Sequence, residues 1–153
     1  MRRLSLLIAR RLGEGAGLLG LSYADDAAIT ERRRRQQRVH TATRGWDLAW
    51  GALLARSLSD PVDVAPRLPR LEPPTLLVTG DQDRLVPAAD TERVAERIPG
   101  ATLRVLPGCG HVPQEECPQA FAEVVGSWLA GRPWDPSDAP APSPPAGGAG
   151  PAP

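Results

Sequence analysis

Two segments decide the fold of this 153-residue chain: PTLLVTGDQDRLVP at residues 74–87 and IPGATLRVLPGCGHVPQEECPQAF at residues 98–121. In each segment a short apolar run is stopped by glycine or proline and is followed by a polar loop. Apolar runs of this length predict buried parallel strands, here over residues 75–79 and 102–106.

The stretches that follow the two runs predict helices. Residues 88–98 and 118–130 are amphipathic, and the second stretch has a proline in its first turn, where a helix tolerates it. Residues 74–131 therefore predict strand, helix, strand, helix. This is a βαβ unit with one covering helix, and its crossover should be right-handed.

The N-terminal part, residues 1–58, predicts helices. Apolar residues recur at helical spacing from 4 to 21 and from 45 to 58, and Thr30 is a candidate N-cap for a helix that carries the run RRRR. The first 23 residues are rich in arginine and poor in acids, which also suits an organellar transit peptide.

Two stretches have compositions that disfavour regular structure. Residues 59–73 are rich in proline and predict an extended linker. Residues 132–153 consist almost entirely of Pro, Ala, Gly, Ser and Asp beyond a single tryptophan, so they have little apolar surface to offset the entropy of ordering. We expect this tail to be disordered.

Charge and hydropathy exclude several function classes. Eighteen basic and eighteen acidic residues balance, which argues against a dedicated nucleic-acid binder, and no apolar run is long enough to span a membrane. The pattern Gly15-x-Gly17-x-x-Gly20 follows a predicted helix rather than a strand, so we expect no dinucleotide site there.

The two cysteines, Cys109 and Cys117, give no disulfide framework, and their spacing with His111 matches no common zinc pattern. We therefore expect no metal and a reduced, soluble intracellular location, in the cytoplasm or in a plastid.

Polar loops follow both predicted strands at the edge where open α/β sheets build their sites. The first loop contains Asp81 and Asp83, and the second contains His111. A carboxylate that accepts a hydrogen bond from one imidazole nitrogen fixes the tautomer and leaves the other nitrogen free to act as a general base.

Together these segments resemble the last two strands of the α/β-hydrolase superfamily. The resemblance implies that the acid is Asp83, third after the glycine that ends the strand, and that the catalytic histidine is His111 of the G-x-G-H turn. It further implies a partial α/β-hydrolase fold, a small-molecule substrate and no metal or organic cofactor. Residues 21–47 show a weaker resemblance to the helical cap of epoxide-hydrolase-like and esterase-like members. This resemblance implies that residues 1–58 are a helical cap segment rather than a transit peptide.

One member of the family's triad is missing from these residues. No G-x-S-x-G nucleophile elbow occurs, and Ser127 lies within a predicted helix. We expect the chain to be part of a hydrolase acting on an ester, epoxide or similar C–O bond, with a serine or aspartate nucleophile elsewhere, and to be inactive alone. The alternative is a non-catalytic, stand-alone pseudoenzyme or partner-binding fragment.

Three further residues are weaker candidates. Trp46 and Trp50 share one face of a predicted helix, where they either pack in a core or line a substrate pocket. His40 is either a surface residue or part of that pocket. Separately, the exposed edge of a two-stranded sheet predicts self-association.

Overall fold

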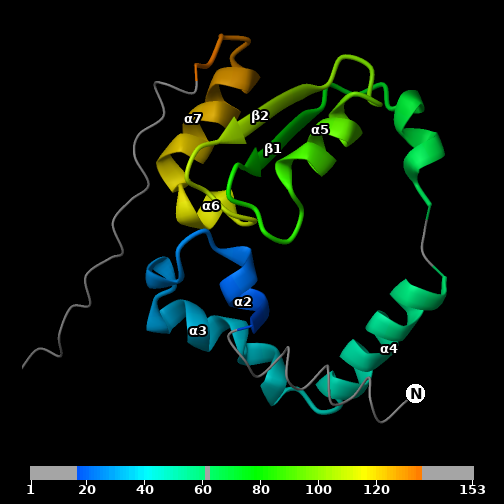
Figure 1. Cartoon of the computed structure of the whole chain (residues 1–153), viewed down its shortest axis with the longest axis vertical. Helices are drawn as coiled ribbons and strands as arrows, with labels where there is room; N and C mark the ends of the chain where they lie inside the picture. Colours follow the sequence, from blue (N-terminus) through cyan, green and yellow to red (C-terminus); the bar gives the residue numbers. More distant parts are fainter. Residues whose placement is uncertain (1–16, 61–62, 136–153) are drawn as a thin grey trace, which may run out of the picture.

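Two parallel strands form the centre of the structure, a computed structural model that describes residues 17–60 and 63–135 (Figure 1). β1 (Leu76–Gly80) and β2 (Thr102–Leu106) pair in register from Leu76 opposite Thr102 to Gly80 opposite Leu106. Both predicted strands are confirmed, within one residue at each end.

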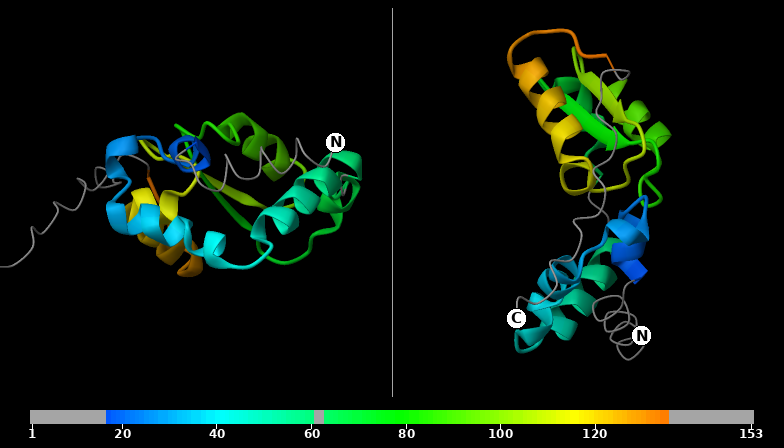
Figure 2. Two further views of the ribbon diagram at one scale, coloured as in Figure 1. Left: turned by 90° about the horizontal axis from the view of Figure 1, so that it is seen from below. Right: turned by 90° about the vertical axis from the view of Figure 1, so that its left-hand side faces the viewer.

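Helices lie on both sides of this pair of strands. α5 (Ala88–Ala95) makes the crossover between the strands, and α7 (Pro118–Leu129) packs on the other side (Figures 1 and 2). Both helices were predicted; the short helix α6 (Pro113–Glu116) was not. Buried side chains of β2, the loop that follows it and α7 form the larger apolar core cluster: Leu106, Cys109, Cys117, Ala120 and Val124.

From residue 17 onward, the N-terminal part is mainly helical, as predicted. α2 (Gly17–Ser22), α3 (Glu31–Gln37) and α4 (Trp46–Ser59) are joined by 3₁₀ turns at Asp26–Ala28 and Val39–Ala42. Thr30 caps α3, because its hydroxyl accepts from the Arg33 N–H at 3.2 Å. α2 and the start of α3 lie next to the carboxyl ends of the strands, whereas α4 stands apart from them (Figure 1).

Two sequence predictions need correction. The stretch 59–73 is not wholly extended, since Ala65–Arg70 forms a 3₁₀ helix that contains Pro69. Proline suits this turn because its fixed φ lies in the 3₁₀ range. Trp134, which was assigned to the tail, belongs to the folded part: it packs against the core cluster, with the Arg104 guanidinium 5.9 Å from its ring centroid.

The remainder of the predicted tail, 136–153, lies outside the described residues, as does the first part of the helix predicted over 4–21. Among the residues that the structure describes, no helix is both long and apolar enough to cross a membrane.

Candidate functional site

Asp83 and His111 form a hydrogen-bonded pair at the carboxyl ends of the two strands. The imidazole Nδ1 of His111 lies 2.9 Å from Oδ2 of Asp83. The Asp83 side chain is only 4% exposed, whereas that of His111 is 39% exposed. The carboxylate is therefore enclosed, while the imidazole remains open to solvent.

The second oxygen of Asp83 is held by the backbone of its own loop. Oδ1 accepts from the N–H groups of Leu85, at 2.9 Å, and Val86, at 2.8 Å. Burial by itself would raise the pKa of the Asp83 carboxyl, but the hydrogen bonds from Val86, His111 and Leu85 outweigh it. The pKa of Asp83 is consequently lowered, and the carboxylate is ionised at neutral pH.

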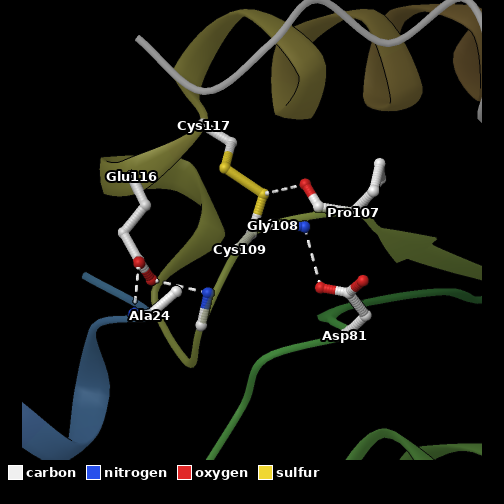
Figure 3. Close-up of a disulfide and its surroundings, with 8 residues drawn as sticks. Ala24, Asp81, Pro107, Gly108, Cys109, Glu116 and Cys117 are labelled. Carbon is white, nitrogen blue, oxygen red and sulfur yellow. Dashed lines mark hydrogen bonds between the residues drawn. A yellow bond between two sulfur atoms is a disulfide. The ribbon is translucent and has the colours of Figure 1, made fainter. Parts of the chain in front are cut away.

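Asp81, the other acid of this loop, has a structural role. Its Oδ1 accepts from the backbone N–H of Gly108 at 2.8 Å and so joins the loop after β1 to the loop after β2 (Figure 3). The Gln82 N–H also donates to the Cys109 carbonyl at 2.9 Å. The two loops approach so closely that a Cβ on Gly80 would lie 1.9 Å from that carbonyl oxygen.

The histidine loop is closed by a disulfide between Cys109 and Cys117 (Figure 3). The prediction that the cysteines are unpaired is wrong. Helix α6 turns the chain back, bringing the two Cα atoms to 6.3 Å, which is within bonding range. Because disulfides persist in oxidising compartments, the argument for a reduced location no longer holds. In the described residues no group of three or more His, Cys, Asp or Glu could hold a metal ion.

Sequence reasoning missed the role of two adjacent carboxylates, Glu115 and Glu116. Glu116 is buried at the base of the histidine loop, and Glu115 contacts Tyr23. Glu115 bonds Tyr23, and Glu116 bonds Ala24, each across 92 residues of sequence, so no local pattern marks these two contacts.

The three weaker pocket candidates lie on elements that do not adjoin the Asp83–His111 pair. Trp46 and Trp50 are partly buried on α4, which packs against the 3₁₀ turn Val39–Ala42 that contains His40. In Figure 1, α4 is separated from the loops at the strand ends. A pocket role for these three residues stays a prediction.

A model of the alpha/beta hydrolase family matches residues 2–124. The chain belongs to this family. The 2-hydroxy-6-oxo-6-phenylhexa-2,4-dienoate hydrolase of Burkholderia cepacia is 38% identical over 68 residues, which are 44% of this chain and 24% of that protein. A 2-hydroxy-6-oxononadienedioate/2-hydroxy-6-oxononatrienedioate hydrolase of Klebsiella pneumoniae matches with the same identity and coverage.

Solved structures agree with this assignment. A thermophilic esterase from Thermogutta terrifontis superposes with a TM-score of 0.65 at 25% identity, over 85% of this chain and 48% of that one. A meta-cleavage product hydrolase from Pseudomonas fluorescens gives 0.64 at 23% identity, over 75% of this chain and 44% of that one. The chain thus spans about a quarter of the matched curated relatives and about half of the solved chains.

Proposed function

We propose that Asp83 and His111 are the acid and the general base of a nucleophile–acid–histidine triad that hydrolyses an ester or a related carbonyl compound. The proposal rests on the 2.9 Å hydrogen bond at the strand ends between the buried carboxylate of Asp83 and the partly exposed imidazole of His111. This is the arrangement that a hydrolytic triad needs from its second and third members.

The proposed chemistry depends on which imidazole nitrogen of His111 is hydrogen-bonded to Asp83. Asp83 accepts from Nδ1–H, so the Nε2 lone pair is available to take a proton from a nucleophile. The imidazolium that forms is stabilised by the Asp83 carboxylate, whose lowered pKa keeps it ionised. The histidine then gives the proton to the leaving group, which returns the pair to its starting state.

A carbonyl substrate is favoured over an epoxide. The relatives named above are hydrolases of 6-oxo-dienoates and an esterase, and both classes of substrate present a carbonyl carbon to a nucleophile. Epoxide hydrolysis is the alternative, and turnover of styrene oxide would reveal it.

The nucleophile of the proposed triad lies outside these 153 residues, which contain no G-x-S-x-G sequence. Ser127 does not substitute for it, because it lies within α7 and lines an open groove of about 460 Å³ together with Arg132 and Trp134. The chain by itself is therefore inactive on this proposal.

A graft tests the proposal. Residues 17–135 replace the corresponding C-terminal part of the Burkholderia cepacia hydrolase, and turnover of p-nitrophenyl acetate and styrene oxide is compared with that of the chain alone. We expect ester turnover only in the graft, falling about 10³–10⁴-fold in His111→Ala and Asp83→Asn. Asp81→Asn is the matched control and keeps activity, because an amide oxygen can still accept from Gly108. Equal turnover in His111→Ala would overturn the proposal, and activity of the chain alone would place a nucleophile within it.

The outer edges of the two-stranded sheet favour self-association. In the described residues the sheet has two strands, each with one edge that no neighbouring strand covers. Open edges pair readily with other chains, so we propose concentration-dependent self-association. Light scattering across a dilution series measures it, and a constant monomer mass would contradict it.

A further inference from the structure

Glu116 places a buried carboxylate directly beneath the histidine loop. The residue is 8% exposed, and each of its oxygens accepts from a different backbone N–H: Oε1 from Gly110 at 2.9 Å, and Oε2 from Ala24 at 2.6 Å (Figure 3). Burying a carboxylate is unfavourable unless hydrogen bonds compensate it, and here two N–H donors do so.

These bonds act next to the imidazole-bearing residue. Gly110 immediately precedes His111, and the His111 N–H donates to the Ser22 carbonyl at 2.8 Å. The chain from Ser22 to Ala24 therefore lies against the chain from Gly110 to His111. It is bonded directly to it at Ser22, and the Glu116 carboxylate bridges the N–H groups of Ala24 and Gly110. The two segments are in close contact, since a Cβ on Gly110 would lie 2.6 Å from the Ala24 nitrogen.

The neighbouring Glu115 makes contacts of a different kind. It accepts from the Tyr23 hydroxyl at 2.6 Å and forms an ion pair with Arg33 of α3, and its side chain is one-quarter exposed. Glu115 thus connects α3 to the histidine loop through side-chain contacts. Glu116, by contrast, accepts a hydrogen bond from the backbone N–H of the residue that precedes His111.

The orientation of His111 depends on that backbone. Its side chain is more than one-third exposed and is held on one side by Asp83, so packing by itself does not set the ring plane. If Gly110 shifts, the Nδ1–Oδ2 distance and the direction of Nε2 both change.

We propose that Glu116 is a positioning residue, which holds His111 in register with Asp83 by clamping the N–H groups of Gly110 and Ala24. This inference rests on the proposed function, because positioning has meaning only if the Asp83–His111 pair is used.

Nuclear magnetic resonance of ¹⁵N-histidine-labelled full chain tests it, because His40 and His111 are the only two histidines. In the wild type we expect His111 in a single Nδ1–H tautomer whose ring proton exchanges slowly. In Glu116→Gln one of the two N–H groups faces an NH₂ group and loses its acceptor. Exchange of the Nδ1 proton should then accelerate about tenfold or more, with mixed tautomers, while the His40 signal stays unchanged.

Glu115→Gln is the matched control and should leave the His111 ring signals as in the wild type. Unchanged His111 signals in Glu116→Gln would overturn the positioning role while leaving the proposed function intact. Wild-type His111 signals that do not respond to Asp83→Asn would overturn both.

A measurement on the unmodified chain covers the case in which the variant does not fold. Amide hydrogen exchange should show the Gly110 and Ala24 N–H groups to be protected to the same degree as the β1–β2 ladder. Fast exchange of both amides in the folded wild type would contradict the clamp.

Discussion

The strand-containing region and the α4 region bury their apolar residues very differently. Leu106 at the end of β2 is completely buried and lies in a core cluster with Val124. On α4, by contrast, Leu53 is 58% exposed, and Leu48 is also exposed.

The Asp83–His111 pair at the strand ends is therefore supported by two different kinds of contact. One kind is the apolar packing of the core cluster that includes Leu106 and Val124. The other is a set of polar contacts between the Asp83 loop and residues 20–26. Arg84, from the Asp83 loop, donates to the carbonyls of Gly20 and Tyr23 and lies 3.6 Å from Asp26. No described residue of α4 belongs to either buried core cluster, and Leu48 and Leu53 on it are exposed, so substitutions at these two positions should be tolerated.

Truncation of one leucine in each region should give the largest contrast. Leu106→Ala removes a fully buried side chain and leaves a cavity, so we expect a loss of about 2–5 kcal/mol in the free energy of unfolding. Leu53→Ala on α4 should change it by less than about 0.5 kcal/mol. Urea denaturation followed by circular dichroism measures both, and equal losses would show that α4 is packed as tightly as the sheet.

Two glycine substitutions test how closely the loops approach. Gly80→Ala places a methyl group against the Cys109 carbonyl, so we expect a loss of about 1–3 kcal/mol, at the upper end of that range. Gly126→Ala in α7 meets nothing within 4 Å and should raise stability by about 0.5–1 kcal/mol through helix propensity. Denaturation midpoints that move in the same direction for both variants would contradict this account of the strand ends.

The pH dependence of stability tests the enclosure of Asp83. A carboxyl whose pKa is lowered on folding adds stability above its unfolded pKa of about 3.9, and that stability is lost as pH falls through the folded value. Asp83→Asn should therefore lose roughly 1 kcal/mol at pH 7 and show a shallower decline below about pH 4. Thermal melts at pH 7 and pH 3 give both quantities, and parallel acid profiles for variant and wild type would refute the lowered pKa.

The smallest expected effect concerns Tyr23, the only tyrosine, and appears only at alkaline pH. Burial and the hydrogen bond to Glu115 raise its pKa to about 12, although Arg33 opposes them. Because the folded pKa lies above the ordinary value of about 10, the associated stability is complete below pH 10 and is lost between pH 10 and 12. Tyrosinate absorbance should show a midpoint near 12 in the wild type. In Glu115→Gln the midpoint should be lower. A wild-type midpoint near 10 would contradict the burial of Tyr23 and its hydrogen bond to Glu115.

Local patterns predicted the strands and the helices well, because periodicity and Pro/Gly stops are properties of neighbouring residues. The family resemblance, rather than these patterns, selected Asp83 over Asp81, and the structure places Asp83 against His111 and Asp81 against Gly108. The prediction for the cysteines failed because α6, a single turn, is too short to give a periodic signal and yet brings Cys109 and Cys117 together.

The order of elements, the βαβα unit and the two loops that carry Asp83 and His111 follow from the sequence, since they depend on short-range propensity and on the chain direction of parallel strands. Which backbone groups hold those loops depends on tertiary packing. Glu116 reaches Ala24, and Arg84 reaches Tyr23, across separations of 92 and 61 residues. Contacts at such separations arise when distant segments are packed together, and no spacing along the chain encodes them.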